Sequence, residues 1–157
     1  MRAFWLRHVM NLWPPFRAAG IRIRRMDNDY RCVEVELRRK LFNRNYVGTH
    51  FGGSLFAMTD PFYMLMLMHN LGPRYLVWDH SAKIRFCKPG VGTVWARFQL
   101  DQHEIDRIAN EATDGSASYH EFVIEVLDAD GEAVARVEKT VYVRLKPRHR
   151  DSAQAES

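Results

Sequence analysis

The chain has 157 residues, of which 46% are apolar and 27% are charged, with a net charge of +4 and two cysteines. This balance is typical of one globular domain that buries most of its surface. It excludes extensive disorder and a disulfide scaffold, and the apolar runs fall short of the roughly 18 residues of a membrane span. Arg7, His8 and Asn11 interrupt the apolar start of the chain. We therefore expect no signal peptide and a cytoplasmic protein with reduced thiols.

Positive charge is concentrated near the start of the chain. Residues 1–50 contain 11 Lys and Arg against 4 Asp and Glu, whereas residues 101–157 contain 7 against 13. A basic half can attract phosphates, nucleic acid or an anionic membrane surface, or it can be a solvated arginine-rich face. Because there is no zinc-finger spacing and no RNP-like aromatic motif, we do not expect a nucleic-acid-binding protein.

The first 19 residues predict an amphipathic helix. Pro14 and Pro15 then end it, because proline is not tolerated inside a helix. Such a helix either docks on its own domain or lies on a membrane surface. The apolar side chains at roughly helical spacing are Phe4, Trp5, Val9, Leu12, Trp13 and Phe16.

Alternating apolar and polar residues predict several strands. Residues 20–40 read as a hairpin around the turn at residues 27–29, and further strands are expected around residues 82–86, 94–100, 122–126 and 135–143. A short helix is expected over 102–112, and 146–157 is expected to be a frayed, charged tail. Lys139 falls on the apolar side of the last strand, which a β-bulge or a side chain reaching out to solvent would explain.

The segment from Gly52 to Leu71 predicts one helix, ended by Gly72 and Pro73. It is apolar nearly all round, so it must be buried on most sides. A helix of this kind beside a long antiparallel sheet indicates an α+β fold, in which the sheet curls around the helix. We see no internal repeat and no second domain.

A motif joins this helix to the preceding loop. Residues 45–60 read Asn-Tyr-Val-Gly-Thr-His-Phe-Gly-Gly-Ser-Leu-Phe-Ala-Met-Thr-Asp. This run resembles the signature of PaaI-type acyl-CoA thioesterases of the hot-dog superfamily. With Val77-Trp78-Asp79 and residues 85–90, it is most similar to an uncharacterised, thioesterase-like subgroup. The resemblance covers roughly residues 20–145 and implies the hot-dog fold, in which a curled antiparallel sheet wraps around a long buried helix. It implies no cofactor.

Residue by residue, the resemblance places functional groups at Asn45, Gly52, Gly53 and Asp60. Phe51 stands where the family has its histidine. His50 lies one position earlier, where an extended chain points a side chain the other way.

These residue types suit thioester hydrolysis. The Gly53 N–H would stabilise the developing oxyanion at the start of the helix, although paired glycines also serve tight turns and close packing. Asp60 would act as a general base or nucleophile, or would cap local backbone groups. A buried carboxylate must in any case be paired, shifted in pKa or functional. Asn45 would position the substrate, or would form a turn with Asn43.

Spacing along the helix suggests a second subunit. Gly53 and Asp60 are two helical turns apart, about 10 Å along the axis, so one thioester carbonyl cannot readily reach both in the same helix. If both act, Asp60 serves the Gly53 of another subunit. The resemblance likewise implies a site at a homodimer interface, within a dimer or tetramer.

The leading hypothesis is therefore an acyl-CoA thioesterase that takes an acyl-CoA or acyl-carrier thioester. The alternatives are an acyl-binding or lipid-binding hot-dog protein without catalysis, and a hot-dog dehydratase or hydratase. Neither the cysteines nor the histidines have metal-ligand spacing. The residues expected to bind the substrate are His50, Phe51, Gly52, Ser54, Met64, Arg85 and Lys88.

Overall fold

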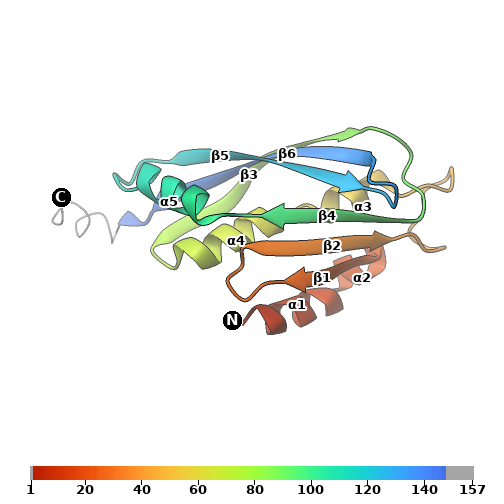
Figure 1. The fold of residues 1–157 in the computed structure, drawn as a ribbon, viewed down its shortest axis with the longest axis horizontal. Coiled ribbons are helices and arrows are strands. Elements are labelled where there is room, and N and C mark those ends of the chain that lie inside the picture. Colours follow the sequence, from red (N-terminus) through yellow and green to blue (C-terminus); the bar gives the residue numbers. More distant parts are fainter. Residues whose placement is uncertain (1, 148–157) are drawn as a thin grey trace.

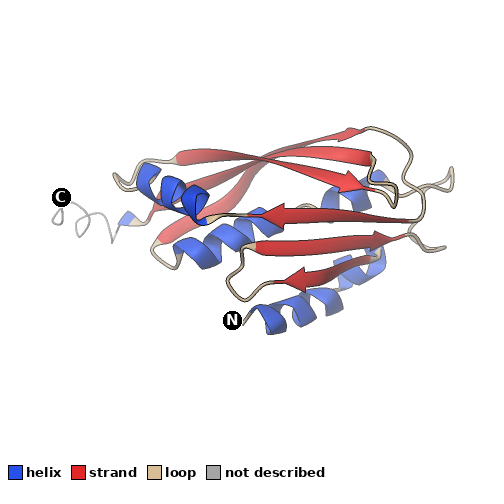
Figure 2. Cartoon of the chain, viewed as in Figure 1, coloured by secondary structure: helices blue, strands red, loops and turns tan. Residues whose placement is uncertain are grey.

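The structure is a computed structural model, and it describes residues 2–147 of the chain. The expected tail from residue 148 onward lies outside the described residues. A six-stranded antiparallel sheet curls over a central helical segment, with the N-terminal helices packed along one side of the sheet (Figure 1, Figure 2).

The N-terminal segment forms two helices, α1 (Ala3–Leu12) and α2 (Pro14–Ala19). The first helix ends before the prolines, as predicted, and Pro14 then occupies the first position of α2, where its missing N–H costs nothing. Gly20 ends α2 with a φ of 83°, and a Cβ there would lie 2.6 Å from the Arg38 carbonyl oxygen. Glycine is required at this turn because of both the backbone angle and the close approach.

The predicted strands are confirmed. Strand order in the sheet is β1-β2-β4-β5-β6-β3, and every neighbouring pair is antiparallel. The hairpin over residues 20–40 is the β1–β2 pair. Helix α5 (Gln102–Glu111) follows β4, and its N-terminus is capped by the Asp101 side chain, which accepts from the Glu104 N–H. The strands are β1 (Ile21–Met26), β2 (Cys32–Arg38), β3 (Tyr75–Phe86), β4 (Thr93–Gln99), β5 (Ser118–Leu127) and β6 (Ala133–Leu145).

The central segment is helical over the predicted range but is interrupted once. Helix α3 (Gly52–Ala57) and helix α4 (Phe62–Leu71) are separated by a turn that contains Asp60 and Pro61. Pro61 has no N–H to continue the helical hydrogen bonds, and its ring clashes with a preceding carbonyl. The segment supplies the centre of the core, where Met58, Phe62 and Met66 have no exposed surface.

A β-bulge in β3 decides which side chains face this core. Asp79 pairs with Val141 and Ala82 pairs with Lys139, so three steps along β3 correspond to two steps along β6. Paired residues of an antiparallel ladder point to the same face. The bulge at His80 therefore turns Asp79 toward the inner face that Lys139 also occupies. A bulge was expected near Lys139, and it lies in the partner strand.

The two edges of the sheet differ. Along β1, the Asn11 side chain of α1 accepts from the Ile23 N–H at 2.7 Å and donates to the Ile23 carbonyl at 3.1 Å, as a neighbouring strand would. At the other edge, β3 pairs with β6 on one side only within the described residues. A 12-residue edge strand of this kind is a template for pairing with another chain.

Candidate active site

The side chain of Lys139 is completely buried and contacts two carboxylates. Its Nζ lies 2.8 Å from Oδ2 of Asp79 and 3.2 Å from Oδ1 of Asp60, and it also donates to the backbone carbonyl of Asp60. The expectation that this lysine reaches out to solvent is therefore wrong. A buried ammonium is tolerated only where opposite charges and acceptors surround it, as they do here.

The two carboxylates have different surroundings. The Asp60 side chain is 58% exposed and lies in the turn between α3 and α4, whereas that of Asp79 is 23% exposed and lies on the inner face of β3. Burial raises the pKa of Asp79, and the hydrogen bond and positive charge of Lys139 oppose that rise. Asp60 is paired, as expected, but it is not buried.

A pocket of about 360 Å³ opens beside Asp60. Asp60 and Gly53 line the same pocket of one chain, because the chain turns after α3 instead of continuing as a straight helix. The spacing of these two residues therefore no longer requires a second subunit. The pocket has two walls. The N-terminal segment supplies one of them with Trp13, Pro15 and Phe16. The central segment supplies the other with Gly53, Phe56, Ala57, Asp60 and Pro61.

The two glycines at the start of α3 are both closely covered by aromatic rings. A Cβ on Gly53 would lie 2.3 Å from the Phe51 ring, and a Cβ on Gly52 would lie 2.9 Å from the Phe86 ring. Both rings belong to exposed side chains that can move, so close packing alone is a weak reason for these two glycines. Gly53 also lies in the first turn of α3, where backbone N–H groups have no partner within the helix. Its amide is the donor that this pocket offers to a bound carbonyl oxygen.

Four of the other predicted residues line a different pocket of about 490 Å³: Asn45, His50, Gly52 and Lys88. This second pocket takes Gly52 and Leu55 from α3, whereas the pocket beside Asp60 takes Gly53 and Phe56. Residues three apart share one face of a helix, so the two pockets lie on different sides of α3. Asn45, His50 and Lys88 line the second pocket and are therefore not brought together with Asp60.

The side chains of Asn45 and His50 are both held by hydrogen bonds to loop residues. The Asn45 side chain donates to Oγ1 of Thr49 and to the His50 carbonyl, and it accepts from the Thr49 N–H. Asn45 thus closes a turn, with Thr49 instead of Asn43. His50 is buried, and its Nε2 donates to the Gly92 carbonyl oxygen over 2.8 Å. Burial lowers the pKa of His50, which favours the neutral ring.

The two basic residues predicted to bind the substrate differ in availability. The Lys88 ammonium lies 2.6 Å from Oδ2 of Asp128 and also pairs with Glu132, which raises the pKa of Lys88 and offsets its charge. Arg85 is exposed on β3. Of the remaining predicted contacts, Ser54 is buried in α3 and Met64 is half-buried in α4 against the core.

Lys139 and Asp79 are the site residues that our sequence reasoning missed. Two signals were present: a lysine on the apolar side of a strand, and an aspartate whose position is out of phase with the apolar residues that follow it on β3. Each residue taken alone has a simple structural explanation, and only the fold shows that the two side chains meet.

Among residues 2–147, no cluster of three or more His, Cys, Asp or Glu is placed to hold a metal ion. No helix of this described part is long and apolar enough to cross a membrane.

Comparison with known proteins establishes the fold family. A probable thioesterase of unknown function from Pseudomonas aeruginosa superimposes with a TM-score of 0.81 at 19% identity, over 93% of this chain and 97% of that one. A thioesterase from Haemophilus influenzae gives 0.65 at 14% identity, over 92% of each chain. The PaaI protein of the E. coli phenylacetic acid degradation operon gives 0.61 at 19% identity, over 90% and 93%. These identities support a shared fold and no more.

No curated protein matches the sequence. The family model described as Domain of unknown function (DUF4442) matches residues 2–143, which is nearly the whole described chain. The sheet curled around a central helical segment agrees with the solved relatives. The chain therefore belongs to the DUF4442 family and has the hot-dog fold of thioesterase-like proteins.

Proposed function

We propose that this protein hydrolyses acyl thioesters in the pocket beside Asp60. One observation carries the proposal: an exposed carboxylate, held in place by a fully buried lysine, opens into an apolar pocket that Gly53, in the first turn of α3, also lines. The thioesterases among the solved relatives add to it, because their folds are alike.

In this mechanism Asp60 is the general base. Its carboxylate takes a proton from a water molecule, whose oxygen attacks the thioester carbonyl carbon, and the negative charge moves to the carbonyl oxygen near the Gly53 N–H. When the tetrahedral intermediate collapses, the C–S bond breaks and the thiolate takes the proton back from Asp60. The products are a carboxylic acid and a free thiol. Lys139 does not touch the substrate, and acts as a positioning residue that fixes the Asp60 carboxylate.

The substrate class follows from the pocket walls. The aromatic rings of Trp13, Phe16 and Phe56 suit an apolar acyl group, and the thiol carrier would extend out of the exposed mouth at Asp60. Trp13 and helix α2 thus form part of the acyl site. Coenzyme A and an acyl carrier protein both present the same thioester, and we propose coenzyme A as the carrier.

We further propose that the protein is a homodimer formed along β3. In the described part of the chain this 12-residue strand pairs on one side only, whereas the opposite edge of the sheet is covered by α1. Pairing two copies of β3 would satisfy the open hydrogen-bonding groups of both. The site beside Asp60 would then lie close to the subunit interface, because Asp79 belongs to the same strand.

Thiol release from short, long, aromatic and hydroxyacyl coenzyme A thioesters tests the proposal. Asp60→Asn should lower kcat by roughly a hundredfold or more, as the loss of a general base does. The matched control is Asp130→Asn, an exposed aspartate in the turn between β5 and β6, which should leave kcat unchanged. Circular dichroism must show that both variants are folded. Release that is unaffected by Asp60→Asn would remove Asp60 from the mechanism.

A second candidate function is acyl binding without turnover. The observation that favours it is the Phe51 ring, which lies 2.3 Å from where a Cβ on Gly53 would stand and so crowds the residue proposed to bind the substrate oxygen. In that case titration calorimetry would detect acyl-CoA binding while every thioester of the panel stays intact. A dehydratase is not supported, since His50 is bound to Gly92 and lines a different pocket from Asp60.

A further inference from the structure

Helix α1 turns its apolar side outward. Only Ala3 and Met10 of α1 are buried against the domain, although the helix packs along β1. Trp5, Val9 and Leu12 recur at intervals of four and three residues, share the opposite face and are 61%, 56% and 65% exposed. Phe4 and Trp13 flank this stripe and are also exposed. The helix therefore docks on its own domain, yet its main hydrophobic face has no partner within the described residues.

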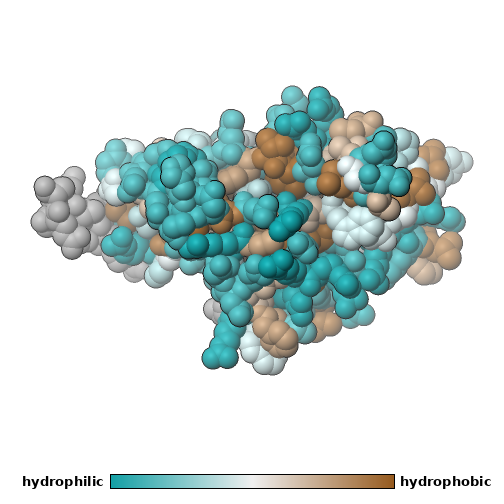
Figure 3. Space-filling model, in the orientation of Figure 1, coloured by the Kyte–Doolittle hydropathy of each residue, from teal (hydrophilic) through white to brown (hydrophobic). Residues whose placement is uncertain are grey.

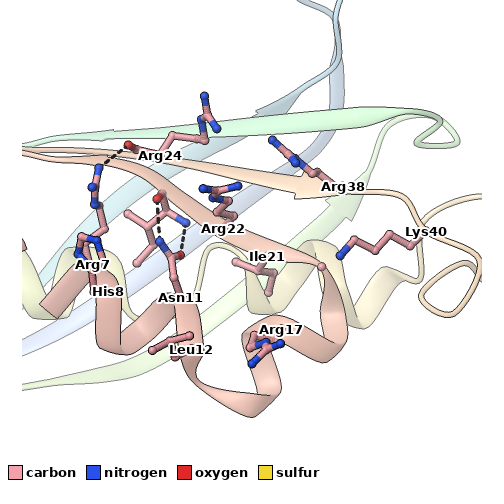
Figure 4. A pocket seen from close by; sticks show the side chains of 12 residues that line it. Arg7, His8, Asn11, Leu12, Arg17, Ile21, Arg22, Arg24, Arg38 and Lys40 are labelled. Carbon is pink, nitrogen blue, oxygen red and sulfur yellow. Dashed lines mark hydrogen bonds between the residues drawn. The ribbon is translucent and has the colours of Figure 1, made fainter. Parts of the chain in front are cut away.

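A basic groove runs directly alongside this stripe. It measures about 660 Å³ and lies between α1 and the β1–β2 pair, with its cationic side chains drawn from both (Figure 4). Leu12 belongs both to the stripe and to the groove lining. Six cations line the groove, and no acidic residue is among its lining residues: Arg7, Arg17, Arg22, Arg24, Arg38 and Lys40.

Only part of this charge is offset. Glu36 forms ion pairs with Arg38 at 2.7 Å and with Arg24 at 3.6 Å, so one carboxylate offsets the charge of two of the six cations. The Arg7 guanidinium donates to the Arg24 backbone carbonyl. This hydrogen bond fixes the position of the Arg7 side chain but does not neutralise its charge. On the face drawn in Figure 3, pale and brown spheres lie along the lower edge beside hydrophilic ones, where Figure 1 places α1.

We propose that α1 and the adjacent groove dock the protein on an anionic lipid bilayer. The stripe of Trp5, Val9 and Leu12 inserts at the level of the headgroups, and the groove arginines contact lipid phosphates. An interfacial helix with aromatic and aliphatic residues outward and cations beside them is the arrangement that such binding requires. Trp5, Val9 and Leu12 are not among the residues that line the pocket beside Asp60, so this proposal does not rest on the proposed hydrolysis.

Two other occupants explain the surface less completely. Nucleic acid would use the cations but would leave the apolar stripe unexplained. A second copy of the chain, packed symmetrically through the same face, would cover the stripe but would also bring two sets of six cations together. An anionic bilayer complements both parts of the surface.

The test is co-sedimentation of the full-length protein with two kinds of vesicle. One is pure phosphatidylcholine, and the other is an equal mixture of phosphatidylcholine and phosphatidylglycerol. Binding to the mixture should be at least roughly tenfold tighter and should weaken with added salt, because each cation near such a surface contributes about a fivefold factor. Equal binding to both vesicles, or none to either, would overturn the proposal.

A matched pair of variants tests the helix itself. Val9 on α1 and Val91 in the loop before β4 are both 56% exposed, so Val9→Ser and Val91→Ser remove the same amount of exposed apolar surface. Only Val9→Ser should weaken vesicle binding, by roughly fivefold or more. Arg22→Gln should weaken binding at low salt and have less effect at high salt.

Three further results would refute the membrane surface. The first is equal vesicle binding by the two valine variants. The second is a smaller mass of Val9→Ser in light scattering with unchanged vesicle binding, which would identify a second copy as the occupant. The third is tight binding to duplex DNA by wild type and Val9→Ser alike, without vesicle binding.

Discussion

Replacing Lys139 with methionine tests the buried charge cluster most directly. Lys139→Met keeps most of the buried aliphatic length and removes the ammonium that contacts Asp60 and Asp79. Removing one partner of a buried ion pair costs about 3 to 5 kcal/mol, because the remaining charge stays poorly solvated. Since Asp60 is 58% exposed, water replaces much of its lost interaction, and most of the cost falls on Asp79.

We therefore expect the free energy of unfolding to fall by about 3 kcal/mol near pH 7, at the lower end of that range. For a chain of this size the midpoint of thermal unfolding should fall by roughly 6 to 12 °C. Urea unfolding followed by circular dichroism measures the free energy, and Lys83→Met, at an exposed position of β3, is the control that should change it by less than about 0.5 kcal/mol.

The loss should depend on pH with a definite sign. Without Lys139, burial acts unopposed and raises the pKa of folded Asp79 further above its ordinary value. A raised pKa in the folded state means that stability is retained below the unfolded-state pKa and is lost as pH rises through the folded-state pKa. The loss in free energy of unfolding caused by Lys139→Met should therefore be smaller near pH 5 than near pH 7.

Asp79→Asn in the same background provides the second check. It removes the unpaired charge, so the double variant should be less destabilised than the sum of the two single variants, by about 1 kcal/mol or more. A deficit that is equal at both pH values and additive with Asp79→Asn would refute the reasoning, since it would show that the ion pair has no role in stability.

Three further predictions concern other parts of the chain. Burial lowers the pKa of His50, so its contribution to stability is present above the ordinary pKa of 6.5 and is lost as pH falls through the folded-state pKa. In urea unfolding at several pH values, His50→Gln should therefore lose less stability at acid pH than the wild type does. Gly20→Ala should lower the free energy of unfolding by more than about 1 kcal/mol because of its positive φ, whereas Gly53→Ala should change it little, since only an exposed ring must move. Phe62→Ala should cost about 3 to 5 kcal/mol in the core, and Phe42→Ala, at 98% exposure, should cost almost nothing.

Local sequence patterns were sufficient to predict most of the helices and strands of the fold. Alternation identified the strands, and Pro14 located the end of the first helix. The motif over residues 45–60 indicated the fold family, which the structure and the relatives confirm. These features depend on neighbours within a few residues, so the sequence order displays them directly.

The predicted site was harder to assemble from sequence. Gly53 and Asp60 do share a pocket, but Asn45 and His50 line another one, because successive residues of α3 face different directions. The break at Pro61 also invalidates a distance counted along a straight helix. Proximity in sequence within the motif was therefore a poor guide to proximity in space.

The cluster of Lys139, Asp60 and Asp79 was not predicted from the sequence. Lys139 is 79 residues from Asp60 and 60 residues from Asp79, and the bulge at His80 decides that the second aspartate faces inward. A polar residue on an apolar face has several local explanations, and its actual partners depend on how distant strands pair. Periodicity along the chain thus identified the elements and their buried faces, whereas strand register and the bulge, which are tertiary properties, determined which charges meet beside the pocket.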